Sequence, residues 1–245
     1  MDKDVEKILN ELKTNYFKAE PEDKTKYTFY NFELSPKDFM IIIQNPGDLK
    51  EGNQEKEDLK KCNNDEQFIK ICREAFQGWI EKKQNKNFWS EVIKNVQKIN
   101  PNIKIESILE YFYITDVIKK RGKDTKVQPF EKKVLKREVE TVIPKLILVC
   151  GSRAWNSIKD IFETDIIKTN NEKDGGIGTV QKEHGFLFKL KNQKTYIIPL
   201  LHFSNRVTMN SPRNSYYDYM NEGFEMFRSL IKIPKISKYN GSYNL

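Results

Sequence analysis

Four apolar runs in the sequence each end in residues that could take part in chemistry. Gln44, Asn45, Pro46, Gly47 and Asp48 follow the first run, and Asp116 follows the second. Gly151 follows the third run, and His202, Ser204, Asn205 and Arg206 follow the fourth. Among them are a carboxamide, a carboxylate, an imidazole and a guanidinium, which donate and accept hydrogen bonds and stabilise developing charge. These strand-end residues are the candidate site.

The sequence lacks the groups that several other chemistries require. No Ser or Cys stands beside a base at a recognisable spacing, and the only histidines are His184 and His202. Nucleophilic catalysis and a metal centre are therefore not predicted. The glycines of "DGGIGT" (174–179) do not match a phosphate-binding loop, because GxxxxGK[ST] is missing and no core strand precedes them. We expect no cofactor.

Strands alternating with helices are predicted to position the candidate site. We expect strands in 38–48, 108–115, 145–151 and the second arm of a hairpin at 185–202, and a loop at 49–63. Helices are expected at 64–83, 87–99, 130–143, 152–162 and 215–230. This order predicts an α/β fold, a three-layer α/β/α sandwich with a central, mostly parallel four-stranded sheet. Ligands of such folds bind outside the carboxyl ends of the strands.

The 245 residues are expected to form a single domain, 1–245, with an N-terminal helix at about 2–17 and a helical insertion at about 49–100. No stretch approaches 18 consecutive apolar residues, and the charged N-terminus does not resemble a signal peptide. The three cysteines, Cys62, Cys72 and Cys150, contain no CxxC pair and are expected to be reduced thiols. We therefore expect a cytoplasmic monomer that does not contact a membrane.

Positive charge is concentrated in one part of the chain. The formal net charge is +8, and residues 119–137 alone hold nine Lys or Arg against two carboxylates. A clustered basic stretch is typical of proteins that bind a polyanion, nucleic acid above all. The alternative is a solvated lysine-rich surface, which composition alone makes about as common.

Three motifs, in order, resemble the uracil-DNA glycosylase superfamily. "IIIQNPGD" resembles its first motif, Gly-x-Asn-Pro-Gly in several branches. "YITDVIKK", followed by a helix and "PKLILVCGSRAW", is similar to the middle of the bacterial and archaeal branches, and "IIPLLHFSNR" is similar to the closing His-Pro-Ser motif. Each motif alone is weak, but their order and their position at strand ends make the combination specific.

The resemblance implies DNA as the partner, an association with the nucleoid, and a role for each matched residue. Asn45 falls where the superfamily positions the attacking water. His202 falls where it stabilises negative charge on the leaving pyrimidine. Arg206 matches the residue that fills the gap left by the flipped nucleotide. DNA contacts are expected from Ser204, Asn205, Arg206, Lys119, Lys120, Arg121 and Lys123, and base contacts from Asp116, Gln44, Gly47 and Phe68.

Four departures from the superfamily pattern bear on function. Phe203 replaces the proline of the closing motif, and Lys120 stands where iron–sulfur branches have a cysteine, so no cluster is predicted. The aromatic residue that stacks on the flipped base has no clear match, and Phe68 and Phe76 are both candidates. Asp116 replaces the asparagine that reads the base.

Asp116 favours a cytosine-type base over uracil. An ionised carboxylate only accepts hydrogen bonds, so it would meet uracil O4 lone pair to lone pair, at a cost of roughly 1–3 kcal/mol. Cytosine offers the N4 amino group as a donor, and a proton shared between N3 and the carboxylate completes the pair. The ordinary pKa of Asp is about 3.9, and burial raises the pKa of a carboxyl group. Since removal of ordinary cytosine would damage the cell's own genome, we expect either a modified cytosine or restricted access to the base. The resemblance extends to superfamily members that attack modified bases in phage DNA as host defence.

Other interpretations remain open from the sequence. Asp116 could cap a helix or pair with Lys119 or Arg121, His202 could be a structural histidine, and Asn45-Pro46-Gly47 could be an ordinary turn. Within the glycosylase class, the alternative is a uracil-DNA glycosylase of base-excision repair. Outside it, the alternative is a non-catalytic nucleic-acid-binding module of the same fold.

Overall fold

A six-stranded sheet with the strand order β2-β1-β3-β6-β5-β4 lies at the centre of the structure. The structure is a computed structural model, and it describes residues 34–44, 53–81, 83–119, 126–162, 166–168, 187–191, 193–203 and 213–231. The strands are β1 (Phe39–Ile43), β2 (Phe112–Asp116), β3 (Leu146–Cys150), β4 (Ile166–Lys168), β5 (Phe188–Leu190) and β6 (Tyr196–Leu200). β2, β1, β3 and β6 are parallel to one another, whereas β5 and β4 extend the sheet with antiparallel pairing.

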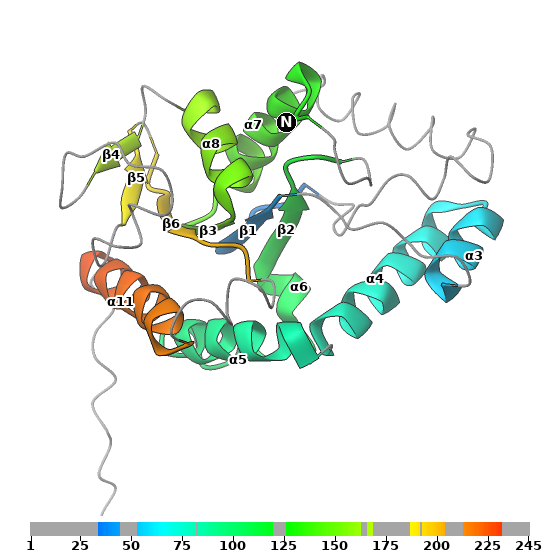
Figure 1. Cartoon of the computed structure of the whole chain (residues 1–245), viewed down its shortest axis with the longest axis horizontal. Coiled ribbons are helices and arrows are strands. Elements are labelled where there is room, and N and C mark those ends of the chain that lie inside the picture. The colour runs from blue at the N-terminus through cyan, green and yellow to red at the C-terminus, as the bar shows by residue number, and fades with distance from the viewer. Residues whose placement is uncertain are drawn as a thin grey trace, which may run out of the picture.

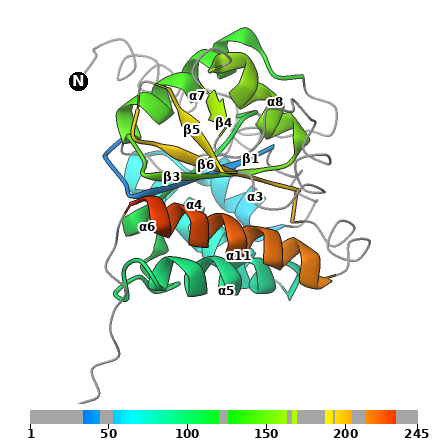
Figure 2. The same ribbon diagram turned by 90° about the vertical axis from the view of Figure 1, so that its left-hand side faces the viewer.

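Helices cover both faces of the sheet (Figures 1 and 2). One face carries α7 (Pro129–Val142) and α8 (Ser152–Ile161). The other carries α4 (Asp65–Glu81), α5 (Lys83–Gln97), the short α6 (Ile108–Tyr111) and α11 (Arg213–Leu230), and α3 (Gln54–Lys61) packs against α4. No helix in these described ranges has the length and apolar character needed to cross a membrane.

The pleat of each central strand divides the core between the two helical layers. In β1, Phe39, Ile41 and Ile43 pack toward α4, α5 and α11, whereas Met40 and Ile42 pack toward α7 and α8. β2, β3 and β6 alternate in the same way, because successive side chains of a strand point to opposite faces. The buried strands are therefore apolar at nearly every position, as is typical of a parallel sheet covered on both faces.

The three-layer α/β architecture predicted from the sequence is confirmed, but the prediction of a four-stranded sheet is wrong. The four parallel strands are those expected, and β5 and β4 add two short antiparallel strands at one edge. The charged segment expected to be a loop at 49–63 contains helix α3, whose first turn is capped by the Asn53 side chain. The segment predicted as an insertion is thus helical over α3, α4 and α5. The N-terminal helix predicted at about 2–17 lies outside the described residues.

Gly151 joins β3 to α8 in a backbone conformation that other residues avoid. Its φ of +103° and ψ of 154° lie in a region that is essentially restricted to glycine. A Cβ at this position would also come within 2.3 Å of Gln44 Nε2 and 2.5 Å of Gln44 Cδ. The conformation therefore requires glycine here, and a Cβ would in addition displace the Gln44 side chain.

We expect Gly151→Ala to lower the free energy of unfolding by about 1–3 kcal/mol, because the strained backbone and the displaced Gln44 side chain both cost energy. Urea unfolding followed by circular dichroism measures this. Gly78→Ala is the matched control, since Gly78 lies inside α4 and an added Cβ would meet nothing within 4 Å. The control should stabilise by roughly 0.5–1 kcal/mol, as alanine is the better helix former. Equal effects of the two changes would contradict this view of Gly151.

Candidate functional site

The carboxyl ends of the four parallel strands lie side by side. The register pairs Asp116 with Ile43, Val149 with Ile42, and Cys150 with Leu200. The residues that follow these strands are therefore neighbours along one edge, in the order Asp116, Gln44, Gly151, then Leu201 and His202. Since adjacent strands lie about 4.8 Å apart, the strands bearing Asp116 and His202 are separated by about 14 Å. This is the edge at which the sequence predicted a site.

Asp116 is held at a fixed strand end. It is 3% exposed, and pairing with β1 continues beyond it, because the N–H of Val117 donates to the carbonyl of Ile43 (2.9 Å) and that of Ile118 to Gln44 (3.2 Å). Phe112 and Ile114 face α4 and α5, whereas Tyr113 and Val117 face α7. The alternation therefore places the Asp116 side chain on the α4–α5–α11 face.

Gln44 lies on the other face of the sheet. Its carboxamide packs against the backbone of Gly151, where even a Cβ would overlap it. This contact places Gln44 at the end of β3, toward α8. The structure thus brings Gln44 and Asp116 to the same edge but not to the same face, and Gln44 contacting a base remains a prediction.

His202 is half-buried just after β6, and the residues on either side of it are anchored. The carbonyl of Leu201 accepts a hydrogen bond from the hydroxyl of Tyr216 on α11 (3.0 Å). The His202 ring lies parallel to that of Phe203, with a centroid distance of 5.1 Å and an interplanar angle of 9°. Burial lowers the pKa of the His202 imidazole, so it is neutral at physiological pH.

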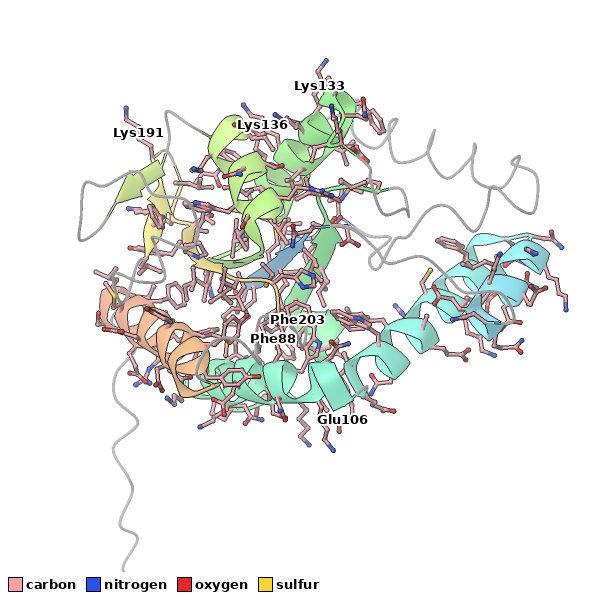
Figure 3. All side chains as sticks on the ribbon, viewed as in Figure 1. Phe88, Glu106, Lys133, Lys136, Lys191 and Phe203 are labelled. Atoms are coloured by element: carbon pink, nitrogen blue, oxygen red, sulfur yellow. The ribbon has the colours of Figure 1, made fainter. Side chains whose placement is uncertain are left out.

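An aromatic cluster of Phe76, Trp79, Phe88, Trp89 and Phe203 fills the space between the end of β6 and helices α4 and α5. Phe203 stacks on Phe88 at 4.2 Å with an interplanar angle of 13°, and Trp79 meets its ring edge to face at 5.5 Å. Figure 3 shows Phe203 and Phe88 next to each other above α5. The residue that departs from the His-Pro-Ser motif is therefore a core residue.

The two candidates for the base-stacking aromatic both lie on α4. Phe76 belongs to the aromatic cluster, where it contacts Trp79 and Trp89, so its ring is engaged in packing. Phe68 is also buried. Stacking of Phe68 on a base remains a prediction.

Lys119, which the sequence predicted to contact DNA, points into the protein in this structure. Its side chain is 3% exposed, and the Nζ atom contacts both carboxylate oxygens of Glu138 at 2.9 Å and donates to the hydroxyl of Thr115. Tyr113 also donates to Glu138 (3.0 Å), and burial together with this carboxylate raises the pKa of Tyr113. The Lys119 ammonium therefore pairs with the Glu138 carboxylate of α7 inside the protein.

A second carboxylate on α7 organises the segment after β2. Glu131 accepts the backbone N–H of Lys119 through Oε1 and that of Gln128 through Oε2, both at 2.8 Å. The same carboxylate therefore caps the first turn of α7 and binds the chain just after β2. Sequence reasoning missed Glu131 and Glu138, although both share the inward stripe of α7 with Val134, Leu135 and Val142, and a carboxylate within such a stripe is rarely buried without a partner.

The remainder of the basic stretch divides into two parts. On α7, Lys132 pairs with Asp160 (2.5 Å), and Lys136 and Arg137 contact Glu140 (3.9 and 3.5 Å). Lys133 and Lys136 point away from the sheet (Figure 3). The other predicted DNA contacts, Lys120, Arg121, Lys123, Ser204, Asn205 and Arg206, lie outside the described residues, as do Asn45 and Gly47.

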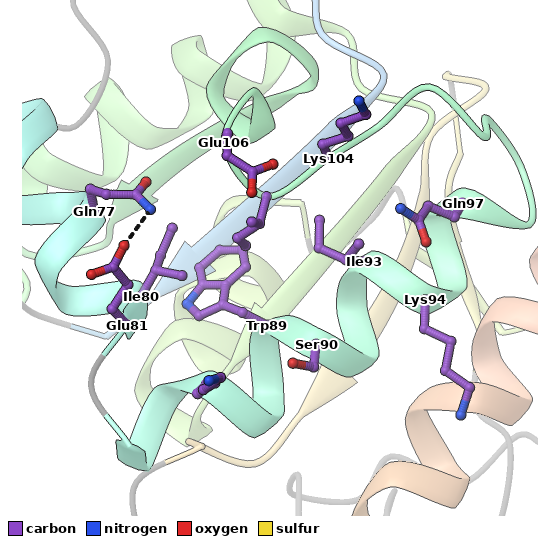
Figure 4. A pocket seen from close by; sticks show the side chains of 12 residues that line it. Gln77, Ile80, Glu81, Trp89, Ser90, Ile93, Lys94, Gln97, Lys104 and Glu106 are labelled. Carbon is purple, nitrogen blue, oxygen red and sulfur yellow. Dashed lines mark hydrogen bonds between the residues drawn. The ribbon is translucent and has the colours of Figure 1, made fainter.

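A surface hollow of about 570 Å³ lies between α4, α5 and residues 104–106 (Figure 4). Trp89, Ile80 and Ile93 line its apolar part, and Glu106 and Lys104 stand at its border. None of the strand-end residues lines it, so it is not the candidate site. Within the described ranges, no three His, Cys, Asp or Glu side chains gather as metal ligands would.

We expect Glu138→Gln to lower the free energy of unfolding by about 3–5 kcal/mol, because it leaves the Lys119 ammonium buried without a counter-charge. Denaturant unfolding measures the loss, and combining it with Lys119→Met should recover part of it. Glu140→Gln on the exposed side of the same helix is the control, with an expected cost of at most about 1 kcal/mol. Equal losses from the two glutamate changes would show that the buried pair is unimportant.

We also expect His202 to titrate below 6.5 and to weaken the fold in acid. Because its pKa is lowered in the folded state, the unfolded chain takes up this proton at higher pH. The contribution is fully present above pH 6.5 and is lost as the pH falls through the folded pKa. Nuclear magnetic resonance of labelled histidine measures the pKa, with His184→Gln to assign the two signals. A His202 pKa at or above 6.5 would contradict the burial argument.

Comparison with known proteins identifies the family of the chain. A search of curated proteins found no match. The family model described as the uracil DNA glycosylase superfamily matches residues 33–225, a range that contains every described strand and all four strand ends. A match of this extent supports a function of the DNA glycosylase type, with DNA as the partner. The chain belongs to the uracil DNA glycosylase superfamily.

Proposed function

We propose that the protein is a DNA glycosylase that flips out a pyrimidine nucleotide and hydrolyses its N-glycosidic bond. Water would add to C1′ of the sugar, and the electron pair of the broken bond would leave with the base, which is then protonated. The products are an abasic site and a free base. Support comes from the family match and from the strand ends, which carry an imidazole and a carboxylate on the same edge.

His202 suits a role as a hydrogen-bond donor to the leaving base. Burial favours the neutral imidazole, which still carries one N–H to donate to an oxygen that becomes negative. A donor that is already in place when charge develops stabilises the transition state more than the ground state. Asn45 is proposed to position the attacking water, as the first motif of the superfamily implies.

The single observation that carries the choice of base is the burial of Asp116 at the end of β2. Because a carboxylate that is 3% exposed is shielded from bulk water, a base held against it has to offer a hydrogen-bond donor. The N4 amino group of cytosine donates to it, whereas uracil O4 cannot. We therefore propose a cytosine-type target for this enzyme.

We propose that the target is a modified cytosine, because an enzyme that removed ordinary cytosine would attack its own genome. Modified cytosines of phage DNA are a target of this kind, and defence against such DNA is the proposed role. Helices α4 and α5 border the face on which Asp116 lies, and they are the elements proposed to accommodate a substituent on the base.

We expect Asp116→Asn to shift selectivity from a cytosine-type base to uracil by about 10- to 100-fold, which corresponds to one mismatched hydrogen-bond pair. Alkali cleavage of abasic sites in single- and double-stranded oligonucleotides measures this. The panel contains uracil, cytosine, and cytosines with small and bulky substituents. Asp38→Asn, which changes a carboxylate at the amino edge of β1, is the control and should leave selectivity unchanged.

Three outcomes of this assay decide the proposal. Release of a cytosine derivative that is lost in Asn45→Ala and in His202→Ala supports it. Strong uracil release by the wild type, with no activity on any cytosine, would make the protein a uracil-repair enzyme. DNA binding without release of any base would make it a non-catalytic module.

A further inference from the structure

We propose that Phe203 is a positioning residue for His202, and that its stack on Phe88 replaces the backbone rigidity that a proline gives to the closing motif. The structural part of this proposal stands on the described contacts alone. Its catalytic part rests on the proposed function, in which His202 contacts the leaving base.

The backbone after β6 needs an anchor that the sequence does not provide locally. A proline locks φ near −65°, whereas a phenylalanine leaves φ free within the allowed regions. The imidazole of His202 could then take many positions unless the neighbouring side chain were fixed. Phe203 is 2% exposed and so is fixed by packing.

The contacts of Phe203 come from two helices. Phe88 of α5 stacks on its ring at 4.2 Å, and Trp79 of α4 meets it at 5.5 Å and 65°. Trp89 braces both of these partners, at 5.4 Å from Phe88 and 5.9 Å from Trp79. Offset and edge-to-face contacts of this kind have preferred geometries, so the ring of Phe203 has little freedom.

His202 is coupled to this anchored ring. His202 and Phe203 are adjacent in sequence, and their rings lie 9° from parallel with a centroid distance of 5.1 Å. On the other side, the buried hydroxyl of Tyr216 binds the carbonyl of Leu201. The backbone that carries His202 is therefore held from α11 before the residue and from α4 and α5 after it.

The test compares Phe203→Leu with Phe227→Leu. Both replace a buried phenylalanine of the same core, but Phe227 packs against Tyr196 at the opposite end of β6. We expect both variants to lose similar stability in urea unfolding. Only Phe203→Leu should raise the His202 pKa toward 6.5, as measured by nuclear magnetic resonance.

In the glycosylase assay, Phe203→Leu should lower kcat by on the order of 10²-fold with little change in KM, because a misplacement of about 1 Å at a reacting centre costs that much. Phe227→Leu should keep kcat close to that of the wild type. Phe88→Leu provides a second variant that removes the same stack without altering the His202 loop, and it should act in the same direction as Phe203→Leu.

The outcomes separate this proposal from the proposed function. If Phe203→Leu and Phe88→Leu both leave the His202 titration unchanged, and Phe88→Leu leaves the ring-current shift of the imidazole protons unchanged, Phe203 is a core residue only and the positioning proposal is overturned. If these signals change in the variants but the wild-type protein releases no base from any DNA, the positioning proposal holds and the glycosylase proposal fails. If the signals change but kcat does not, the catalytic part is overturned.

Discussion

The two-residue period of the four parallel strands is the constraint on which the site depends. Each strand sends alternate side chains to the α7–α8 face and to the α4–α5–α11 face, and the register aligns the four strand ends. A shift of one residue in β2 would exchange the places of Thr115 and Asp116, so that a carboxylate would face Glu138. The fixed register therefore determines which polar group reaches the candidate site and which is used to hold the fold together.

The two faces anchor the site by different physical means. On the α7 side the anchor is polar: Glu138 neutralises Lys119 and binds Tyr113, and Glu131 binds the chain after β2. On the α4–α5 side the anchor is the aromatic cluster around Phe203. Buried ion pairs depend on accurate geometry, because an unpaired charge costs several kcal/mol, whereas aromatic packing depends on shape. Asp116 and His202 thus lie at the ends of strands that are fixed independently.

The sequence predicted the layers and the edge of the sheet because long apolar runs and strand-end polar residues are local signals. The hairpin predicted at 185–202 is confirmed as β5 and β6, but the sequence did not predict β4, since three residues carry no clear period. The burial of Lys119 was also not predicted from the sequence. Whether a lysine is solvated or buried depends on Glu138, which is 19 residues away in the chain and comes near only in the folded protein. Phe203 could be seen as a departure from a motif, but its partners on α4 and α5 could be known only from the packing.

The carboxylate of Glu131 has a consequence for how the chain can vary. Its two oxygens bind the N–H groups of Lys119 and Gln128, so the ends of the intervening segment are brought together by a single side chain. The entropy of closing a loop grows only slowly with its length, and here the fold itself fixes the closure. Residues between these two points can therefore change in number and in charge while the strand that carries Asp116 and the start of α7 stay in place. Substitutions and insertions in this segment should therefore have little effect on the scaffold, as in loops that a rigid framework carries.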